Sequence, residues 1–300
     1  MLKKDKPNIL FIGLGMMGQP MAHRLIQAHY PLFVHDTNRE TVKNYCNQID
    51  AKALLPSDDL SLIDVVITML PDSGIVESVI LGVDNSPGVA SKLKPGSIII
   101  DMSSSEPMRS RELGASLTKM NLIYLDAPVS GGVKRAIDGS LAIMVGGTLE
   151  AFADVQPILE NLGKNIFHVG DPGSGHAIKA LNNYLSAITT LSVAEALIIG
   201  KRFGLDPNKM VDVFNSSSGK SNATENKAKQ FMLNGAFSAG FTAKLMLKDI
   251  TIANQLGSAV NSSMELGEAS LNAWRNALEF LGDDEDHTAI YRYVEQNQSA

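Results

Sequence analysis

The fold of the first part of the chain is decided by the stretch Asn8-Ile9-Leu10-Phe11-Ile12-Gly13-Leu14-Gly15-Met16-Met17-Gly18. Its apolar residues predict a buried β-strand, and a helical pattern follows the glycines from Pro20 to Gln27. The glycines form the G-x-G-x-x-G pattern of a dinucleotide-binding turn. Gly13 makes the tight turn, Gly15 lets the backbone approach a pyrophosphate, and Gly18 brings helix and sheet close together. We therefore predict that residues 13–18 bind the phosphates of a dinucleotide at the N-terminus of the helix.

A second strand pattern, Leu32–His35, ends at Asp36. A carboxylate at this point can accept hydrogen bonds from both ribose hydroxyls of NAD and would repel the 2′-phosphate of NADP. Asp36 could instead begin a turn or cap a helix over Arg39–Gln48. Arg39 is the kind of residue that accommodates NADP. The sequence therefore predicts NAD as the cofactor and leaves NADP open.

Short apolar stretches alternate with helix-like ones through the first half of the chain. Strands that are apolar throughout and separated by helical patterns indicate a parallel sheet covered by helices on both faces. We predict an α/β fold with a Rossmann-type doubly wound sheet over residues 1–170. The expected strands are Asn8–Ile12, Leu32–His35, Val65–Met69, Ser97–Asp101, Leu122–Asp126, Leu141–Val145 and Ile166–Val169.

The pattern changes after Asp171-Pro172-Gly173-Ser174-Gly175. A long apolar helix is expected over Ala177–Arg202, and no strand pattern of comparable strength follows. We predict an all-helical second domain over residues 171–300 for substrate binding and oligomerisation. Its long apolar helices suggest a subunit interface, hence a homodimer or homotetramer. The further helices are expected at Asn208–Asn215, Glu225–Leu233, Leu245–Val260, Met264–Leu281 and Thr288–Gln296.

Composition excludes several classes of protein. The net charge is −6 and no basic run occurs, which argues against a nucleic-acid partner. The single cysteine, Cys46, allows neither an intrachain disulfide nor a cysteine-rich metal site, and the scattered histidines predict no metal site of another kind. No stretch of about 18 uninterrupted apolar residues occurs, so we expect no membrane span and a cytoplasmic protein.

Two further segments carry polar groups suited to chemistry. Ser130-Gly131-Gly132 follows an expected strand end and is either a carboxylate receptor or a flexible turn. Lys179, Asn182 and Asn183 share one face of the long helix. That face either meets solvent or lies near the junction of the two domains, where a lysine could relay the proton of a substrate hydroxyl.

The chain resembles the β-hydroxyacid dehydrogenase family, whose members include 3-hydroxyisobutyrate dehydrogenase and tartronate semialdehyde reductase. The resemblance covers nearly the whole chain and implies hydride transfer between nicotinamide and the β-hydroxyl carbon, or the semialdehyde, of a small hydroxy acid such as 3-hydroxyisobutyrate. It implies that Lys179 is the acid/base and Asn183 orients the substrate. The resemblance rests on Phe11-Ile12-Gly13-Leu14-Gly15-Met16-Met17-Gly18, Asp126-Ala127-Pro128-Val129-Ser130-Gly131-Gly132, Gly175-His176-Ala177-Ile178-Lys179-Ala180-Leu181-Asn182-Asn183 and Lys248-Asp249.

Other positions take roles only through this resemblance. Ser130, Gly131 and Gly132 would hold the substrate carboxylate, and Lys248 would reach the cofactor, with Asp249 directed to the site. Leu70, Pro71 and Ser104 would lie beside the nicotinamide.

Lys134-Arg135 and His176 depart from the residues usual in the family, and Asn222 lies where the pocket varies. These differences leave the substrate open. Two other functions also stay open: imine reduction on the same scaffold, and a non-catalytic NAD-binding scaffold protein. The pairing of Lys179 with the Ser-Gly-Gly turn favours a hydroxy acid.

Overall fold

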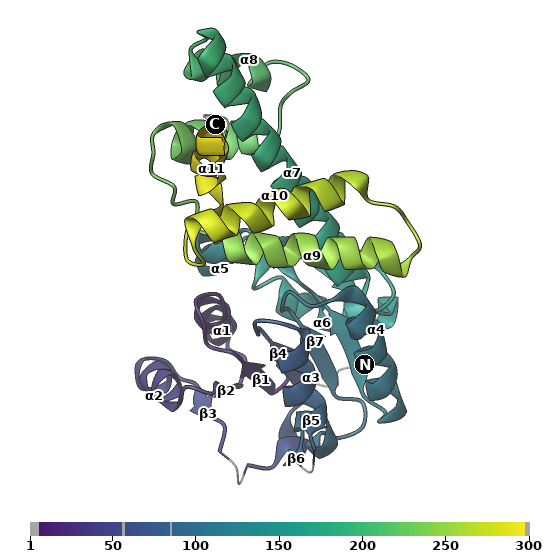
Figure 1. Cartoon of the computed structure of the whole chain (residues 1–300). Coiled ribbons are helices and arrows are strands. Elements are labelled where there is room, and N and C mark those ends of the chain that lie inside the picture. Colours follow the sequence, from purple (N-terminus) through teal and green to yellow (C-terminus); the bar gives the residue numbers. More distant parts are fainter. Residues whose placement is uncertain (1–5, 56–57, 85, 298–300) are drawn as a thin grey trace. The chain divides into compact units, whose positions relative to one another are not determined.

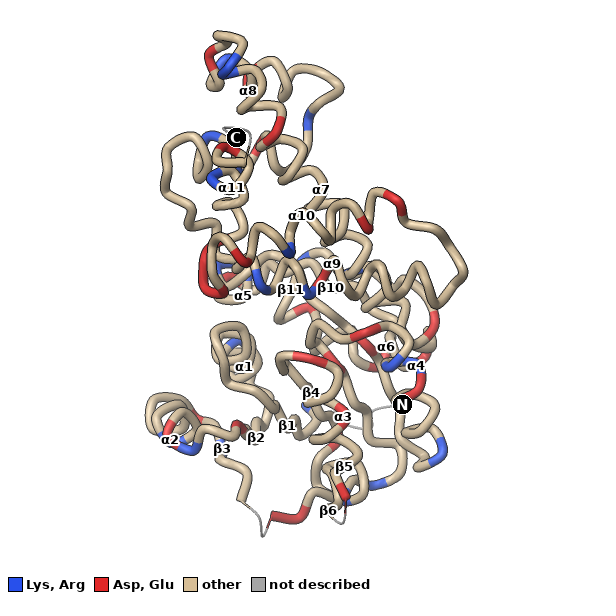
Figure 2. The backbone as a smooth tube through the Cα atoms, in the orientation of Figure 1, with Lys and Arg blue, Asp and Glu red and all other residues tan. Residues whose placement is uncertain are grey.

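The computed structural model describes residues 6–55, 58–84 and 86–297. Its chain divides into two compact units, Met1–Lys179 and Ala180–Ala300, and the division falls inside one long helix (Figure 1). The sequence-based boundary between residues 1–170 and 171–300 stays a prediction. Acidic and basic positions are mixed along both units (Figure 2).

The first unit is built on a sheet that contains nine strands of the described residues. The six neighbouring strands at one side of this sheet are all parallel. Counted in chain order among themselves, they lie in the order 3-2-1-4-5-6 of a Rossmann-type fold. The predicted fold class, a Rossmann-type sheet followed by helices, is confirmed. The sheet runs β3 (Lys52–Ala53), β2 (Leu32–His35), β1 (Ile9–Ile12), β4 (Val65–Thr68), β7 (Ile98–Asp101), β8 (Ile123–Asp126), β10 (Leu141–Gly146) and β11 (Gly163–Gly170), with β9 (Val129–Ser130) beside β10.

The far edge of the sheet differs from the expected parallel arrangement. Strand β10 is antiparallel to both β8 and β9, and β11 is parallel to β10. The chain reverses at Ser130-Gly131-Gly132, where both glycines have positive φ angles of 135° and 68°. Because β9 contains only two residues, its apolar pattern is too short to be recognised in a sequence.

Helices cover both faces of this sheet, as the continuous apolar strands predict. Alternate residues of β1 enter opposite cores because successive side chains of a strand point to opposite faces. Phe11 packs in one core with residues of α1 (Gly18–Gln27) and α6 (Leu149–Leu159). Leu10 packs in the other with α3 (Ser73–Leu81) and α4 (Pro107–Lys119). The remaining elements of this unit are α2 (Arg39–Gln48), α5 (Gly132–Asp138), the hairpin β5 (Gly82–Val83) and β6 (Ser86–Pro87), and the 3-10 helices η1 (Leu60–Leu62) and η2 (Val89–Lys92).

The second unit is helical, and its core surrounds the fully buried Trp274. Among the described residues no named strand follows β11; Thr242 and Asp286 form an isolated bridge. The segment expected as an α-helix near Glu225 is a π-helix. Its helices are most of α7 (Ser174–Phe203), α8 (Pro207–Asn215), η3 (Thr224–Leu233), α9 (Ala243–Ala259), α10 (Glu265–Leu281), the 3-10 helix η4 (His287–Ala289) and α11 (Ile290–Asn297).

Helix α7 is the only described helix that is long and apolar enough to cross a membrane by length and composition. The core helices of water-soluble proteins pass the same test, and 44% of the most apolar window of α7 is buried. The helix is therefore weak evidence for a membrane span.

Candidate functional site

The turn after β1 has no room for side chains at two of its glycines. A Cβ atom at Gly18 would lie 1.9 Å from the carbonyl oxygen of Gly13, and one at Gly13 would lie 2.3 Å from that of Met69. Gly13 also has a φ angle of 102°, which L-residues rarely adopt. The structural roles predicted for Gly13 and Gly18 agree with this geometry.

The N-terminus of α1 suits a bound pyrophosphate. A Cβ atom at Gly15 would meet nothing within 4 Å, so the backbone there faces open space. Met17 provides no side-chain cap, and the first turn contains no acidic residue. By contrast, the side chains of Asn38 and Asp72 cap α2 and α3. Uncapped N–H groups at a helix N-terminus attract anions, so these residues fit the phosphates of a dinucleotide.

Asp36 lies directly after β2 and is held beside the glycine turn. One carboxylate oxygen accepts a hydrogen bond from the Leu14 N–H at 2.7 Å, and the other accepts from the Asn38 N–H at 2.8 Å. Each oxygen retains capacity for a second donor, such as a ribose hydroxyl. Arg39, which begins α2, is exposed.

The three positions expected beside the nicotinamide follow β4 and β7. A methyl carbon of Leu70 lies 3.2 Å from where a Gly13 Cβ would stand, so the structure brings Leu70 to the glycine turn. The Leu70 N–H donates to the Ser103 hydroxyl at 2.9 Å. Pro71 is exposed and Ser104 is half-buried.

Lys179 lies at the start of the Ser-Gly-Gly turn. Its Nζ donates a hydrogen bond to the carbonyl oxygen of Val129, 2.8 Å away, immediately before Ser130. Two segments fifty residues apart in sequence are thus joined within the first unit. Ser130 and Lys179 are half-buried, whereas Gly131 and Gly132 are exposed. The Lys179 amine and two exposed glycines therefore lie close together within the first unit.

Asp126 anchors the helix that carries Lys179. This fully buried carboxylate lies at the end of β8 and accepts hydrogen bonds from the Gly173 N–H at 2.6 Å and the His176 N–H at 2.7 Å. The carboxylate therefore provides acceptors for N–H groups at the N-terminus of α7 and balances the positive partial charge there. The sequence analysis gave Asp126 no role of its own. The sequence signal for this role was an acidic residue at the end of a strand, and acidic residues occur at the ends of many strands.

His176 fixes the same turn of α7 through its side chain. The ring is fully buried; Nδ1 lies 2.7 Å from the Ser110 hydroxyl and Nε2 lies 3.1 Å from the Ser103 carbonyl oxygen. Ser110 belongs to α4 and Ser103 follows β7, so the imidazole connects α7 to two other elements of the first unit. His176 is thus held by contacts to two elements besides its own helix.

The second unit holds the other predicted polar residues. The Asn183 amide donates to a carboxylate oxygen of Asp249, and both side chains are buried. The Lys248 ammonium lies 3.9 Å from the other oxygen of Asp249. Asn183, Lys248 and Asp249 therefore form one cluster between α7 and α9. Asn222, just before η3, is exposed.

A buried lysine that the sequence analysis missed lies in η3. Lys227 donates to the hydroxyls of Ser186 and Thr190 at 3.0 and 3.1 Å. Burial lowers the pKa of Lys227 to about 8, opposed in part by the charge of Asp286. Burial and the nearby Lys227 lower the pKa of His287 to about 4. The sequence analysis did not find Lys227, because the apolar helical pattern of α7 gave no sign that its hydroxyl groups bind a lysine.

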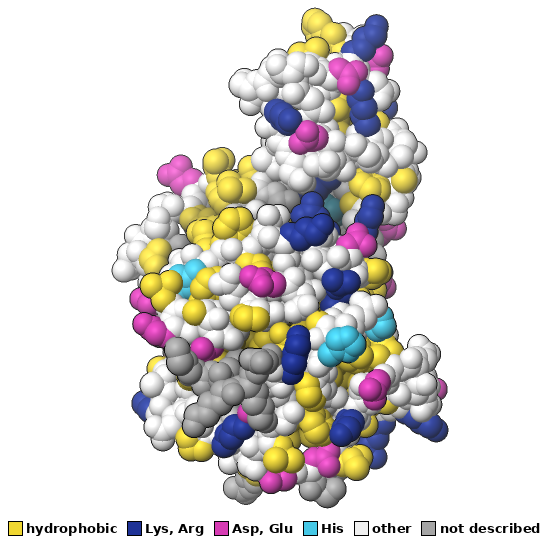
Figure 3. Space-filling model, turned by 180° about the vertical axis from the view of Figure 1, so that it is seen from behind, with side chains coloured by type: hydrophobic (Ala, Val, Ile, Leu, Met, Phe, Trp, Pro, Cys, Tyr) yellow, Lys and Arg dark blue, Asp and Glu magenta, His cyan; other side chains and the backbone are white. Residues whose placement is uncertain are grey.

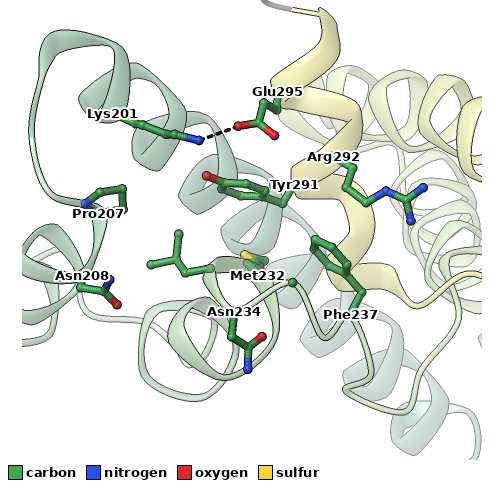
Figure 4. A pocket seen from close by; sticks show the side chains of 11 residues that line it. Lys201, Pro207, Asn208, Met232, Asn234, Phe237, Tyr291, Arg292 and Glu295 are labelled. Atoms are coloured by element: carbon green, nitrogen blue, oxygen red, sulfur yellow. Dashed lines mark hydrogen bonds and ion pairs between the residues drawn. The ribbon is translucent and has the colours of Figure 1, made fainter.

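A pocket of about 460 Å³ lies elsewhere in the second unit (Figure 4). Lys201 and Glu295 form an ion pair across it at 2.9 Å, and Tyr291 and Phe237 contribute aromatic walls. None of the residues predicted to bind substrate or cofactor lines this pocket.

Two family models match successive parts of the chain. Residues 8–170 match the NAD binding domain of 6-phosphogluconate dehydrogenase. Residues 173–294 match the model described as NAD-binding of NADP-dependent 3-hydroxyisobutyrate dehydrogenase.

Characterised relatives match over nearly the full length. The 2-(hydroxymethyl)glutarate dehydrogenase of Eubacterium barkeri is 36% identical, over 95% of this chain and 94% of the relative. The mitochondrial 3-hydroxyisobutyrate dehydrogenase of Bos taurus is 35% identical, over 98% and 89%. A solved structure of Mycobacterium tuberculosis 3-hydroxyisobutyrate dehydrogenase with L-serine has a TM-score of 0.89 and 29% identity, and the match covers 96% of this chain and 99% of that one.

A Rossmann-type sheet, a glycine-rich turn before an uncapped helix and these matches define an NAD(P)-dependent dehydrogenase. The chain belongs to the β-hydroxyacid dehydrogenase family.

Proposed function

We propose that the protein oxidises the β-hydroxyl group of a small hydroxy acid, or reduces the corresponding semialdehyde, with Lys179 as the acid/base. The observation that carries this proposal is the hydrogen bond between the Lys179 Nζ and the Val129 carbonyl oxygen, beside the Ser-Gly-Gly turn. The site suits hydride transfer from a hydroxy acid, because an amine lies next to a turn with two exposed glycines.

The roles follow from the chemistry of the groups. Ser130, Gly131 and Gly132 bind the substrate carboxylate through a hydroxyl and backbone N–H groups. Residues 13–18 and Asp36 would hold NAD(P), which would supply a hydride acceptor for the carbon that carries the hydroxyl group. The hydroxyl proton goes to the Lys179 amine, and in the reverse direction the Lys179 ammonium returns it to the developing alkoxide. Asn183 orients the substrate.

The cofactor contacts proposed for this chain are the backbone of residues 13–18 for the pyrophosphate and Asp36 for the ribose hydroxyls. Leu70, Pro71 and Ser104 would lie beside the nicotinamide, and Lys248 is a further proposed cofactor contact. The hydrogen bonds that Asp36 accepts from the N–H groups of Leu14 and Asn38 support NAD over NADP, because a fixed carboxylate repels a 2′-phosphate.

A substrate panel tests this function. We would measure turnover with NAD and NADP on 3-hydroxyisobutyrate, L-serine, glycerate, 4-hydroxybutyrate and 2-(hydroxymethyl)glutarate. Lys179→Ala should lower kcat by about 100- to 10,000-fold while NAD binding, followed by fluorescence titration, persists. Near-normal turnover by Lys179→Ala would refute the acid/base role. NAD binding without turnover of any acid would favour a scaffold protein, and turnover of a cyclic imine alone would favour imine reduction.

The same proposal includes a homodimer or homotetramer in the cytoplasm. Apolar side chains are exposed on the part of α7 that belongs to the second unit, including Phe203 at 83% and Leu185 at 61%. Figure 3 shows hydrophobic side chains exposed among charged ones on the face that it draws. Light scattering that found a monomer at micromolar concentration would contradict the assembly.

A further inference from the structure

We propose that the substrate is a β-hydroxy acid with a second carboxylate, and that Arg135, assisted by Lys134, binds this second group. The inference rests on the proposed function and refines its substrate class. It concerns the two basic residues of α5, which the proposed reaction does not use.

Arg135 lies over the turn that is proposed to bind the first carboxylate. A Cβ atom at Gly131 would stand 2.4 Å from the Arg135 Cδ and 2.9 Å from its Cβ. The aliphatic stem of Arg135 therefore packs across Gly131, beside the Ser-Gly-Gly turn. A glycine at position 131 is required for this approach as well as for its positive φ angle.

The charges around this turn are unbalanced. Among the described residues, neither Lys134 nor Arg135 has a hydrogen-bond or ion-pair partner for its side chain, and both are exposed. Asp138, on the same short helix, is paired with neither. Two basic residues without a described partner thus follow one turn, on α5, in a chain whose net charge is −6.

A monocarboxylate leaves part of this positive charge without a partner, whereas a dicarboxylate matches it. An arginine guanidinium binds a carboxylate through two parallel hydrogen bonds, which gives affinity and fixes orientation. The first carboxylate lies on the backbone of the turn, and a side arm of the substrate reaches the guanidinium. The lysine beside it adds attraction without a fixed geometry.

The test compares two substrates in matched variants. Arg135→Met keeps the aliphatic stem against Gly131 and removes the charge, and Arg135→Lys keeps the charge and removes the fork. Lys119→Ala, an exposed lysine on α4, is the control. With 2-(hydroxymethyl)glutarate we expect Arg135→Met to lower kcat/KM about tenfold to hundredfold, mainly through KM, since a hydrogen bond to a charged group has this magnitude. With 3-hydroxyisobutyrate we expect less than about a twofold change.

Binding of unreactive acids gives an independent readout. Wild-type protein with NAD should bind glutarate more tightly than butyrate in calorimetry, and Arg135→Met should remove the difference. Equal losses for both substrates, a raised Kd for NAD, or equal binding of glutarate and butyrate by the wild type would overturn the inference. If no hydroxy acid turns over while glutarate binding still depends on Arg135, the proposed reaction fails and the dicarboxylate site stands.

Discussion

Replacing Asp126 by asparagine removes the charge that holds the start of α7, with little change in side-chain volume. The carboxylate accepts two main-chain N–H groups at 2.6 and 2.7 Å in a fully buried position. Asparagine offers one oxygen and turns an NH₂ group toward the other N–H, so one buried donor loses its acceptor. A hydrogen bond to a charged group contributes about 1.5–3 kcal/mol, and the helix N-terminus adds to it. We therefore expect a loss of about 3 kcal/mol in the free energy of unfolding.

Removing a buried charge also relieves a desolvation cost, which could offset this loss. We expect the loss to prevail because both oxygens of Asp126 are already paired with donors. For a unit of this size, about 3 kcal/mol corresponds to a fall in Tm of roughly 6–12 °C. Thermal unfolding of Asp126→Asn beside Glu112→Gln, an exposed carboxylate on α4, measures this difference. An Asp126→Asn midpoint within about 1 °C of the control would refute the anchoring role.

Three further outcomes are expected. Because burial lowers the pKa of Lys227 from 10.5 to about 8, the unfolded chain binds more protons between these pH values and the free energy of unfolding rises with pH. Urea titrations of Lys227→Met should lose this rise, and an unchanged slope would contradict it. Asp36→Ser should shift the ratio of kcat/KM for NAD over NADP toward NADP by at least about tenfold, since a repulsive carboxylate is removed; an unaltered ratio would leave Asp36 without that role. His176→Ala should lower kcat about tenfold without raising the Kd for NAD, because Lys179 loses its fixed position. His176→Gln, which retains an amide donor for the Ser103 carbonyl, should recover most of that activity, and equal losses in both variants would argue against positioning.

Much of the fold was predictable because its signals are local. The strand Leu32–His35 and the helix Arg39–Gln48 were predicted with the bounds that the structure has. Strand β9 was missed because two residues carry no period, and the π-helix η3 was taken for an α-helix because both place apolar residues at similar spacing.

Candidate residues could be singled out, as predictions, where glycines or polar residues interrupt an apolar pattern. The turn after β1 and the Asn183 position are of this kind. The contact of Lys179 with Val129 could not be derived, because it depends on how the chain reverses between β8 and β10. The burial of Lys227 could not be derived either, because its hydroxyl partners on α7 are distant in sequence.

The division of the chain between Lys179 and Ala180 has a consequence for chimaeric proteins that combine the two units from different parents. A chimaera joined at this point would inherit the Lys179 amine from the nucleotide-binding parent, together with Asp126 and His176. Asn183 and Asp249 would come from the other parent. Recombination inside α7 would therefore separate Lys179, the proposed acid/base, from Asn183 one helical turn away. Hybrid proteins should be joined before α7 begins at Ser174, and not within this helix.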